Sequence, residues 1–127
     1  MTKTNKLDPD ALTPLAPAVF HILLSLAEGE RHGYALKREI ARRTDGKLTL
    51  GPGVLYGSIA RMIDQGLIEK SNERPDAEFD DERRRYYRLT AFGQRVAAAE
   101  TQRLAKLLTT ARAKRLLIGP KLAESRR

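Results

Sequence analysis

Apolar residues recur at helical spacing through most of this chain, and two short stretches after residue 66 alternate as strands do. The clearest pattern lies in residues 52–65, where Leu55, Ile59, Met62 and Ile63 fall on one side and predict a helix with one buried face. Glycine, proline and polar residues separate these patterns and mark the turns. The predicted elements are a flexible arm over 1–12, helices over 13–28, 33–44 and 52–65, a strand candidate over 47–50, strands over 67–71 and 83–89, a final helix over 91–118, and a tail over 119–127.

The order of these elements indicates the fold class. Three short helices followed by two strands and their polar loop, together called the wing, are typical of a winged helix-turn-helix domain, here residues 13–90. Thr13 before Pro14, and Thr90 before the final helix, favour helix starts. We therefore predict a mainly α protein with a small β-hairpin: a winged helix-turn-helix plus one long C-terminal dimerisation helix.

The outer face of the helix predicted at 52–65 is slender. It carries Val54, Gly57, Arg61 and Asp64, with Tyr56 and Ser58 on its flanks. The third helix of such a domain normally enters the major groove of DNA. Arg61 can reach a guanine edge or a phosphate, and Tyr56 and Ser58 can donate hydrogen bonds to phosphate oxygens. Tyr56 can equally be a half-buried packing residue.

Composition favours a nucleic-acid partner. The 127 residues include 24 Lys and Arg against 16 Asp and Glu, a formal net charge of +8, which attracts polyanions. The chain has no cysteine, and its two histidines lack an aligned carboxylate, so we expect no metal and no cofactor. His21 and Ser25 lie one helical turn apart without an orienting acid, so we do not expect an enzyme. The polar start and the short apolar run 22–27 predict a cytoplasmic protein that does not enter a membrane.

The wing carries conflicting charges. Six acids and one arginine between residues 73 and 82 give its tip a local charge of −5, which phosphate repels. Either the tip folds away and neutralises the neighbouring arginines or, as we favour, it stays disordered and only the strand bases touch DNA. Alternation in the strand sends Tyr87 to the core and leaves Arg84 and Arg88 freer than Arg85, although an arginine run can also be an ordinary solvated strand edge.

The final helix has an apolar stripe of its own. Its members are Val96, Leu104, Leu107, Leu108 and Ala111, interrupted by Glu100. About 25 residues make a rod of roughly 38 Å, longer than a domain of this size covers, so the stripe predicts a two-fold homodimer. The alternatives are a helix folded back on its own domain or one lying on a membrane surface. A dimer would hold two recognition helices about 34 Å apart and would require an inverted-repeat operator.

Several motifs, in order, carry a family resemblance. They are His32-Gly33-Tyr34, Gly53-Val54-Leu55-Tyr56, Gly66-Leu67-Ile68 and Arg84-Arg85-Tyr86-Tyr87-Arg88-Leu89-Thr90, followed by Gly93. With their spacing, the chain from about Leu15 onward resembles the PadR family of bacterial transcriptional regulators, in the branch with a single C-terminal helix. The resemblance implies a homodimeric winged-helix repressor on a palindromic operator, released by a small aromatic or drug-like effector. It also implies DNA contacts by Tyr34, Tyr56, Ser58, Arg61 and the strand arginines.

These observations lead to the interpretation of a sequence-specific DNA-binding regulator of transcription. Its candidate DNA-binding residues are Tyr34, Lys37, Tyr56, Gly57, Ser58, Arg61, Arg84 and Arg88. Two other interpretations stay open: a protein that coats nucleic acid by charge alone, and a scaffold whose winged domain contacts only protein. The first predicts equal affinity for any duplex, and the second predicts no salt-sensitive DNA binding.

Overall fold

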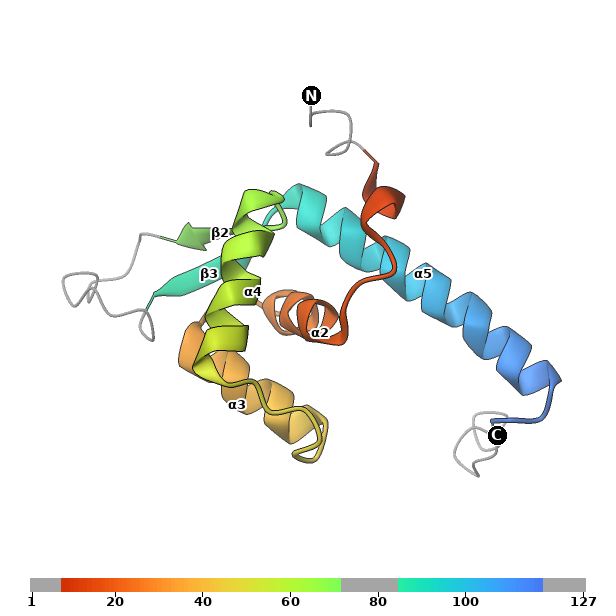
Figure 1. Ribbon diagram of the computed structural model, residues 1–127. Helices are drawn as coiled ribbons and strands as arrows, with labels where there is room; N and C mark the ends of the chain where they lie inside the picture. The colour runs from red at the N-terminus through yellow and green to blue at the C-terminus, as the bar shows by residue number, and fades with distance from the viewer. Residues whose placement is uncertain (1–7, 72–84, 118–127) are drawn as a thin grey trace.

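The fold is seen in a computed structural model, which describes residues 8–71 and 85–117. Its elements are, in order, the 3-10 helix η1 (Pro9–Leu12), α2 (Pro17–Leu26), β1 (Arg31–His32), α3 (Gly33–Arg43), α4 (Pro52–Asp64), β2 (Ile68–Ser71), β3 (Tyr86–Leu89) and α5 (Ala91–Ala113). The strands form one antiparallel sheet in the order β1-β3-β2, with Ile68 opposite Leu89. Helices α2, α3 and α4, followed by the paired strands β2 and β3, confirm the winged helix-turn-helix (Figure 1).

Helix α2 lies at the centre of the domain and contacts α3, α4, β3 and α5 (Figure 1). Its residues Ile22, Leu23 and Leu26 are buried, as their periodicity predicts. The rest of the core comprises Leu36, Ile40, Leu50, Leu55, Ile59, Met62, Leu67, Ile68, Tyr87 and Val96. Because α3 and α4 are each fixed to this core by one apolar face, their opposite faces point outward in a set orientation.

The predicted starts of α3 and α5 are confirmed. The His32 Nδ1 accepts a hydrogen bond from the Ala35 N–H at 3.1 Å, so His32 caps α3. At α5, Thr90 Oγ1 accepts from the Gly93 N–H at 2.9 Å and donates to the Gly66 carbonyl at 2.6 Å. Thr90 therefore ties the start of α5 to the turn between α4 and β2.

The first helix begins later than predicted. The Thr13–Pro14 peptide bond is cis, and α2 begins at Pro17. The Thr13 hydroxyl donates to the Asp10 carbonyl at 3.0 Å and closes η1 instead. Part of the predicted flexible arm is thus a 3-10 helix that contacts α5. The prediction is wrong because Pro14 and Pro17 suit a first helical turn equally well, and the apolar pattern does not choose between them.

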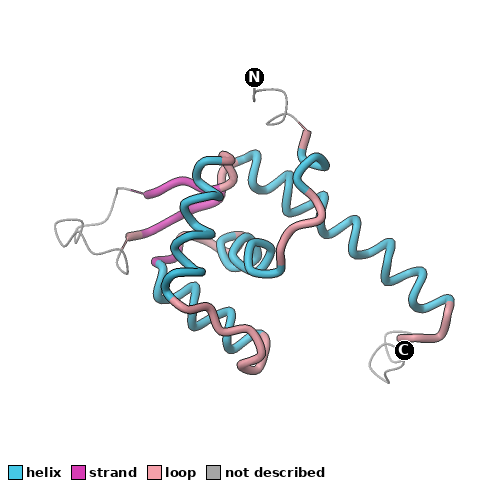
Figure 2. The backbone as a smooth tube through the Cα atoms, in the orientation of Figure 1, coloured by secondary structure: helices cyan, strands magenta, loops and turns pink. Residues whose placement is uncertain are grey.

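The strand predictions are confirmed only in part. Residues 47–50 form no strand, and Figure 2 shows the connection from α3 to α4 as a loop, with Leu50 buried in the core. The short β1 was not predicted, because two residues carry no alternation. Strand β3 begins at Tyr86 instead of residue 83, and the acidic loop together with Arg84 lies outside the described residues.

Candidate DNA-binding surface

Helix α4 presents the predicted outer face. Val54 is 57% exposed, and Arg61 is exposed two turns further along the same side. Gly57 lies between them and adds no side chain. A narrow face of this kind fits the major groove of DNA, because little separates the helix backbone from the base edges.

Ser58 does not belong to that face. It is only 2% exposed and lies in the buried stripe with Leu55 and Met62, one turn before and one turn after it. Its hydroxyl accepts a long hydrogen bond from Arg61 Nη2 at 3.5 Å, so the guanidinium lies back along α4 over Gly57. The prediction that Ser58 lies on the flank of the outer face is wrong. Packing against the core buries it, and the helical periodicity of the sequence does not show that packing.

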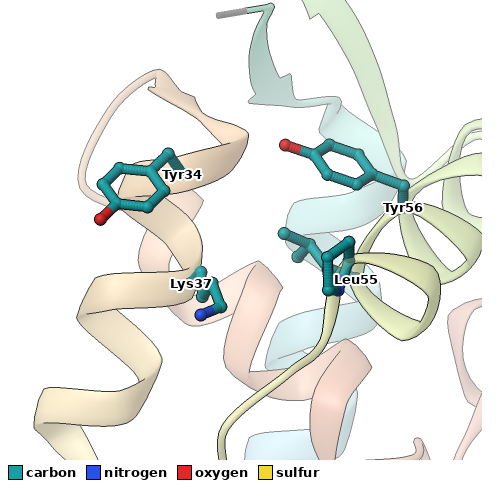
Figure 3. Close-up of a pocket in the computed structure, with 5 residues that line it drawn as sticks. Tyr34, Lys37, Leu55 and Tyr56 are labelled. Carbon is teal, nitrogen blue, oxygen red and sulfur yellow. The ribbon is translucent and has the colours of Figure 1, made fainter. Parts of the chain in front are cut away.

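A hollow of about 180 Å³, the α3–α4 hollow, opens between these two helices. Figure 3 shows Tyr34 and Lys37 of α3 on one side and Leu55 and Tyr56 of α4 on the other, and Pro52 completes the lining. Tyr34 is 48% exposed. The walls are almost entirely apolar, and Figure 3 shows the Tyr34 hydroxyl directed away from Leu55 and Tyr56, so the hollow itself suits an apolar group.

Tyr56 is half-buried, as one of its two interpretations predicts. Its ring lies across the start of α3: a Cβ on Gly33 would lie 2.9 Å from two ring carbons of Tyr56. Any larger residue at this position would force the Tyr56 ring to move, so glycine allows α3 to pass this close to α4. The Tyr56 hydroxyl points toward α3 (Figure 3), so packing and a contact with phosphate are compatible.

Arg88 is engaged within the wing. Its Nε donates to Glu69 at 2.9 Å, and its Nη1 lies 3.9 Å from Glu30. Glu69 is the register partner of Arg88, so the pairing of β2 with β3 creates the ion pair. Tyr87 is buried as predicted, and the partly exposed Arg88 is held by acidic side chains of its own chain.

His21 and Ser25, which the sequence places one helical turn apart, hold α2 to α3. Arg43 Nη2 donates to Ser25 Oγ at 2.9 Å, and Arg43 Nη1 lies 3.1 Å from His21 Nδ1. Burial, and then the charge of Arg43, lower the pKa of His21 below its ordinary value. Glu39 is already paired with Arg31 and Arg43. Within the described ranges, no cluster of three acidic or histidine side chains could hold a metal ion.

Helix α5 has a buried first half and an exposed second half. Val96 is fully buried in the core of its own chain, so its assignment to the dimer seam is wrong: the first turns of α5 still pack on α2. The half that extends away from the domain (Figure 1) carries Leu104, Leu107 and Leu108, which are 38%, 54% and 43% exposed, and a half-buried Ala111. The helix ends at Ala113, before the predicted residue 118. Neither α5 nor any other helix of the described residues is long and apolar enough to cross a membrane.

Glu100 anchors the middle of α5. Arg103 donates to both carboxylate oxygens, at 2.9 and 2.7 Å, and the side chain of Glu100 is only 2% exposed. The hydrogen bonds from Arg103 outweigh the effect of burial and keep the pKa of Glu100 below its ordinary value. The sequence shows Glu100 only as a gap in the apolar stripe: Arg103 stands one turn away, but the burial of the carboxylate depends on elements packed against α5, which leave no local signal.

A known family matches the stretch that builds this surface. The family model described as "Transcriptional regulator PadR-like family" matches residues 22–99, which hold the second half of α2, all of α3 and α4, the sheet and the first turns of α5. The chain belongs to the PadR-like family. It is therefore a DNA-binding regulator of transcription, and the family assignment excludes the enzyme interpretation.

Relatives of this PadR-like protein support the assignment. An uncharacterized 37.1 kDa protein in transposon TN4556 of Streptomyces fradiae is 33% identical over 86 residues, 68% of this chain, and the chain spans only 22% of that relative's length. A solved transcriptional regulator from Clostridium thermocellum is 25% identical, with a TM-score of 0.58 over 80% of this chain and 92% of that one. RosR of H. salinarum is 28% identical, with a TM-score of 0.57 over 78% and 79% of the two chains.

Proposed function

We propose that this PadR-like protein is a homodimeric repressor that binds an inverted-repeat operator and leaves it when a small effector binds. The observation that supports this most is the uncovered leucine stripe on the protruding half of α5. An exposed apolar face on an extended helix is most simply covered by the same face of a second copy, related by a two-fold axis.

The outer face of α4 enters the major groove in this proposal. Arg61 leaves its long bond to Ser58 and extends to a guanine edge, and the absence of a side chain at Gly57 permits a close approach. At the α3–α4 hollow, Tyr34 and Lys37, with the hydroxyl of Tyr56, hold a backbone phosphate beside the groove. These phosphate contacts set the register in which the bases are contacted.

The wing contributes less than the sequence predicts. Arg88 must exchange Glu69 for a phosphate before it can contact DNA, and the ion pair that it loses offsets part of the gain. Arg84 stays a candidate contact. In the dimer, two copies of α4 lie about one turn of DNA, roughly 34 Å, apart, so the operator is an inverted repeat.

Release by an effector has two candidate locations. The α3–α4 hollow has apolar walls beside the outer face of α4, so a small aromatic molecule bound there would occupy the space that the phosphate needs. A dimer can also enclose a cavity between α2 and α5. In either place the effector acts by binding the free protein more tightly than the DNA-bound one. A regulator that occupies its operator until such a molecule binds represses transcription. Because it acts on the chromosome, its proposed location is the cytoplasm.

Selection of bound fragments from genomic DNA tests this proposal. We expect the full chain to enrich an inverted repeat and to protect two half-sites, and at least one member of a panel of small aromatic compounds to release it. The Leu107→Glu variant is the matched comparison, because its α4 face is intact while its dimer seam carries a charge. Equal affinity for every duplex would overturn the proposal in favour of binding by charge alone.

A further inference from the structure

We infer that Val54 selects for thymine, by packing against its 5-methyl group in the major groove; the inference rests on the proposed docking of α4. Val54 lies in the first turn of α4 and is 57% exposed. It shares the outer face of the helix with Arg61. Neither the sequence motifs nor the family match assigns a role to this side chain.

The spacing along α4 places Val54 over a base pair of its own. Val54, Gly57 and Arg61 stand at positions i, i+3 and i+7, which form one straight stripe along a helix. Seven residues span about 10.5 Å at ~1.5 Å each. Successive base pairs are about 3.4 Å apart, so Val54 lies roughly three base pairs from the one that Arg61 contacts.

The chemistry of valine decides which base it accepts. Its side chain ends in two methyl groups and offers neither a donor nor an acceptor. The major-groove edges of guanine, adenine and cytosine would lose hydrogen bonds to water against such a surface, and this loss costs free energy. Thymine instead presents its methyl group in the groove, which gains from the same contact. A thymine is therefore favoured at this position in each half-site.

Replacing thymine by deoxyuridine removes only that methyl group and tests the contact directly. In a duplex enriched by the full chain, each thymine under α4 is replaced one position at a time. The guanine that Arg61 contacts is the one whose replacement does not weaken binding by the Arg61→Ala variant. At the thymine about three base pairs from that guanine, we expect the substitution to weaken binding roughly fourfold per half-site, which corresponds to the free energy of burying one methylene group. Replacing the corresponding thymine in both half-sites should weaken binding by about 15-fold.

Variants at Val54 assign the effect to this side chain. Val54→Ala should bind the thymine duplex about fourfold more weakly and should no longer distinguish thymine from uracil at that position. Val54→Thr keeps a branched methyl group and should retain the distinction. Both changes are at an exposed position, so the fold should survive, and circular dichroism checks this. With cytosine at that position, adding a 5-methyl group should strengthen binding by the parent chain but not by Val54→Ala.

The outcomes separate this inference from the proposed function. If an inverted repeat is enriched but deoxyuridine is neutral at every thymine under α4, the role of Val54 is refuted and the operator proposal stands. The role of Val54 is also refuted, with the operator proposal intact, if Val54→Ala distinguishes thymine from uracil as well as the parent does. If no sequence is enriched, both proposals fail together.

Discussion

Shortening Leu107 to alanine should weaken the proposed dimer about 30-fold. Leu107 is 54% exposed in the single chain and lies in the middle of the α5 stripe. Burial of a whole leucine side chain stabilises by roughly 2 kcal/mol, so covering the exposed half of Leu107 contributes about 1 kcal/mol. A two-fold axis uses the side chain twice, so Leu107→Ala loses about 2 kcal/mol per dimer, equivalent to a 30-fold rise in the dissociation constant.

Sedimentation equilibrium over a dilution series measures that constant. Thr109→Ala is the matched control, because Thr109 is exposed on the opposite side of α5. We expect it to dimerise as the parent does, with the same helix content by circular dichroism. A dissociation constant for Leu107→Ala equal to that of the parent would refute the assignment of the seam and place the interface on another surface.

Three further predictions concern the DNA-binding surface and its support. Arg61→Ala should weaken operator binding by about 1–3 kcal/mol and flatten discrimination at one base position in a gel-shift series of operator variants; a uniform loss would mean a phosphate contact. Gly33→Ala should lower the free energy of unfolding in urea by about 1–3 kcal/mol, because its Cβ displaces the Tyr56 ring, and a stabilised variant would show that the ring moves freely. The pKa of Glu100 is lowered by Arg103, so its stabilisation is complete above the ordinary value of 4.5 and is lost as the pH falls through the lower folded value. As the pH is lowered below 4.5, the urea midpoint of Glu100→Gln should therefore fall less than the urea midpoint of the parent chain.

The elements best predicted from the sequence are those whose signals are local. Helix α4 shows its buried stripe, its starting Pro52 and its terminating Gly66 within 15 residues. The capping residues His32 and Thr90 likewise lie beside the helices that they start. Strand β1 fails this condition, because its two residues become a strand only by pairing with β3. The start of α2 fails as well, since Pro14 and Pro17 give the same local signal and only Pro17 begins the helix.

The candidate site follows the same physical division. The exposed face of Arg61 and Gly57 was predictable because helical geometry alone defines it. Ser58 and Val96 were placed on the wrong face because a second element decides each of them: the core against α4, and α2 against α5. The ion pair of Arg88 with Glu69 was not predictable either, because the ends of the predicted strands do not give the register that sets these two residues opposite each other.

The direction in which α5 leaves the domain governs how two copies can present α4 to DNA. At its start, Thr90 bonds to the turn after α4, and Gly93 lies so close to the Leu67 carbonyl that any Cβ would collide with backbone atoms. Further along its length, α5 also packs against η1. A rod attached at two points cannot tilt about one without breaking the other, so the exposed leucines keep a set orientation relative to α4. In the proposed dimer, pairing through those leucines would therefore fix the separation of the two α4 helices, and with it the spacing of the half-sites that one dimer can bind.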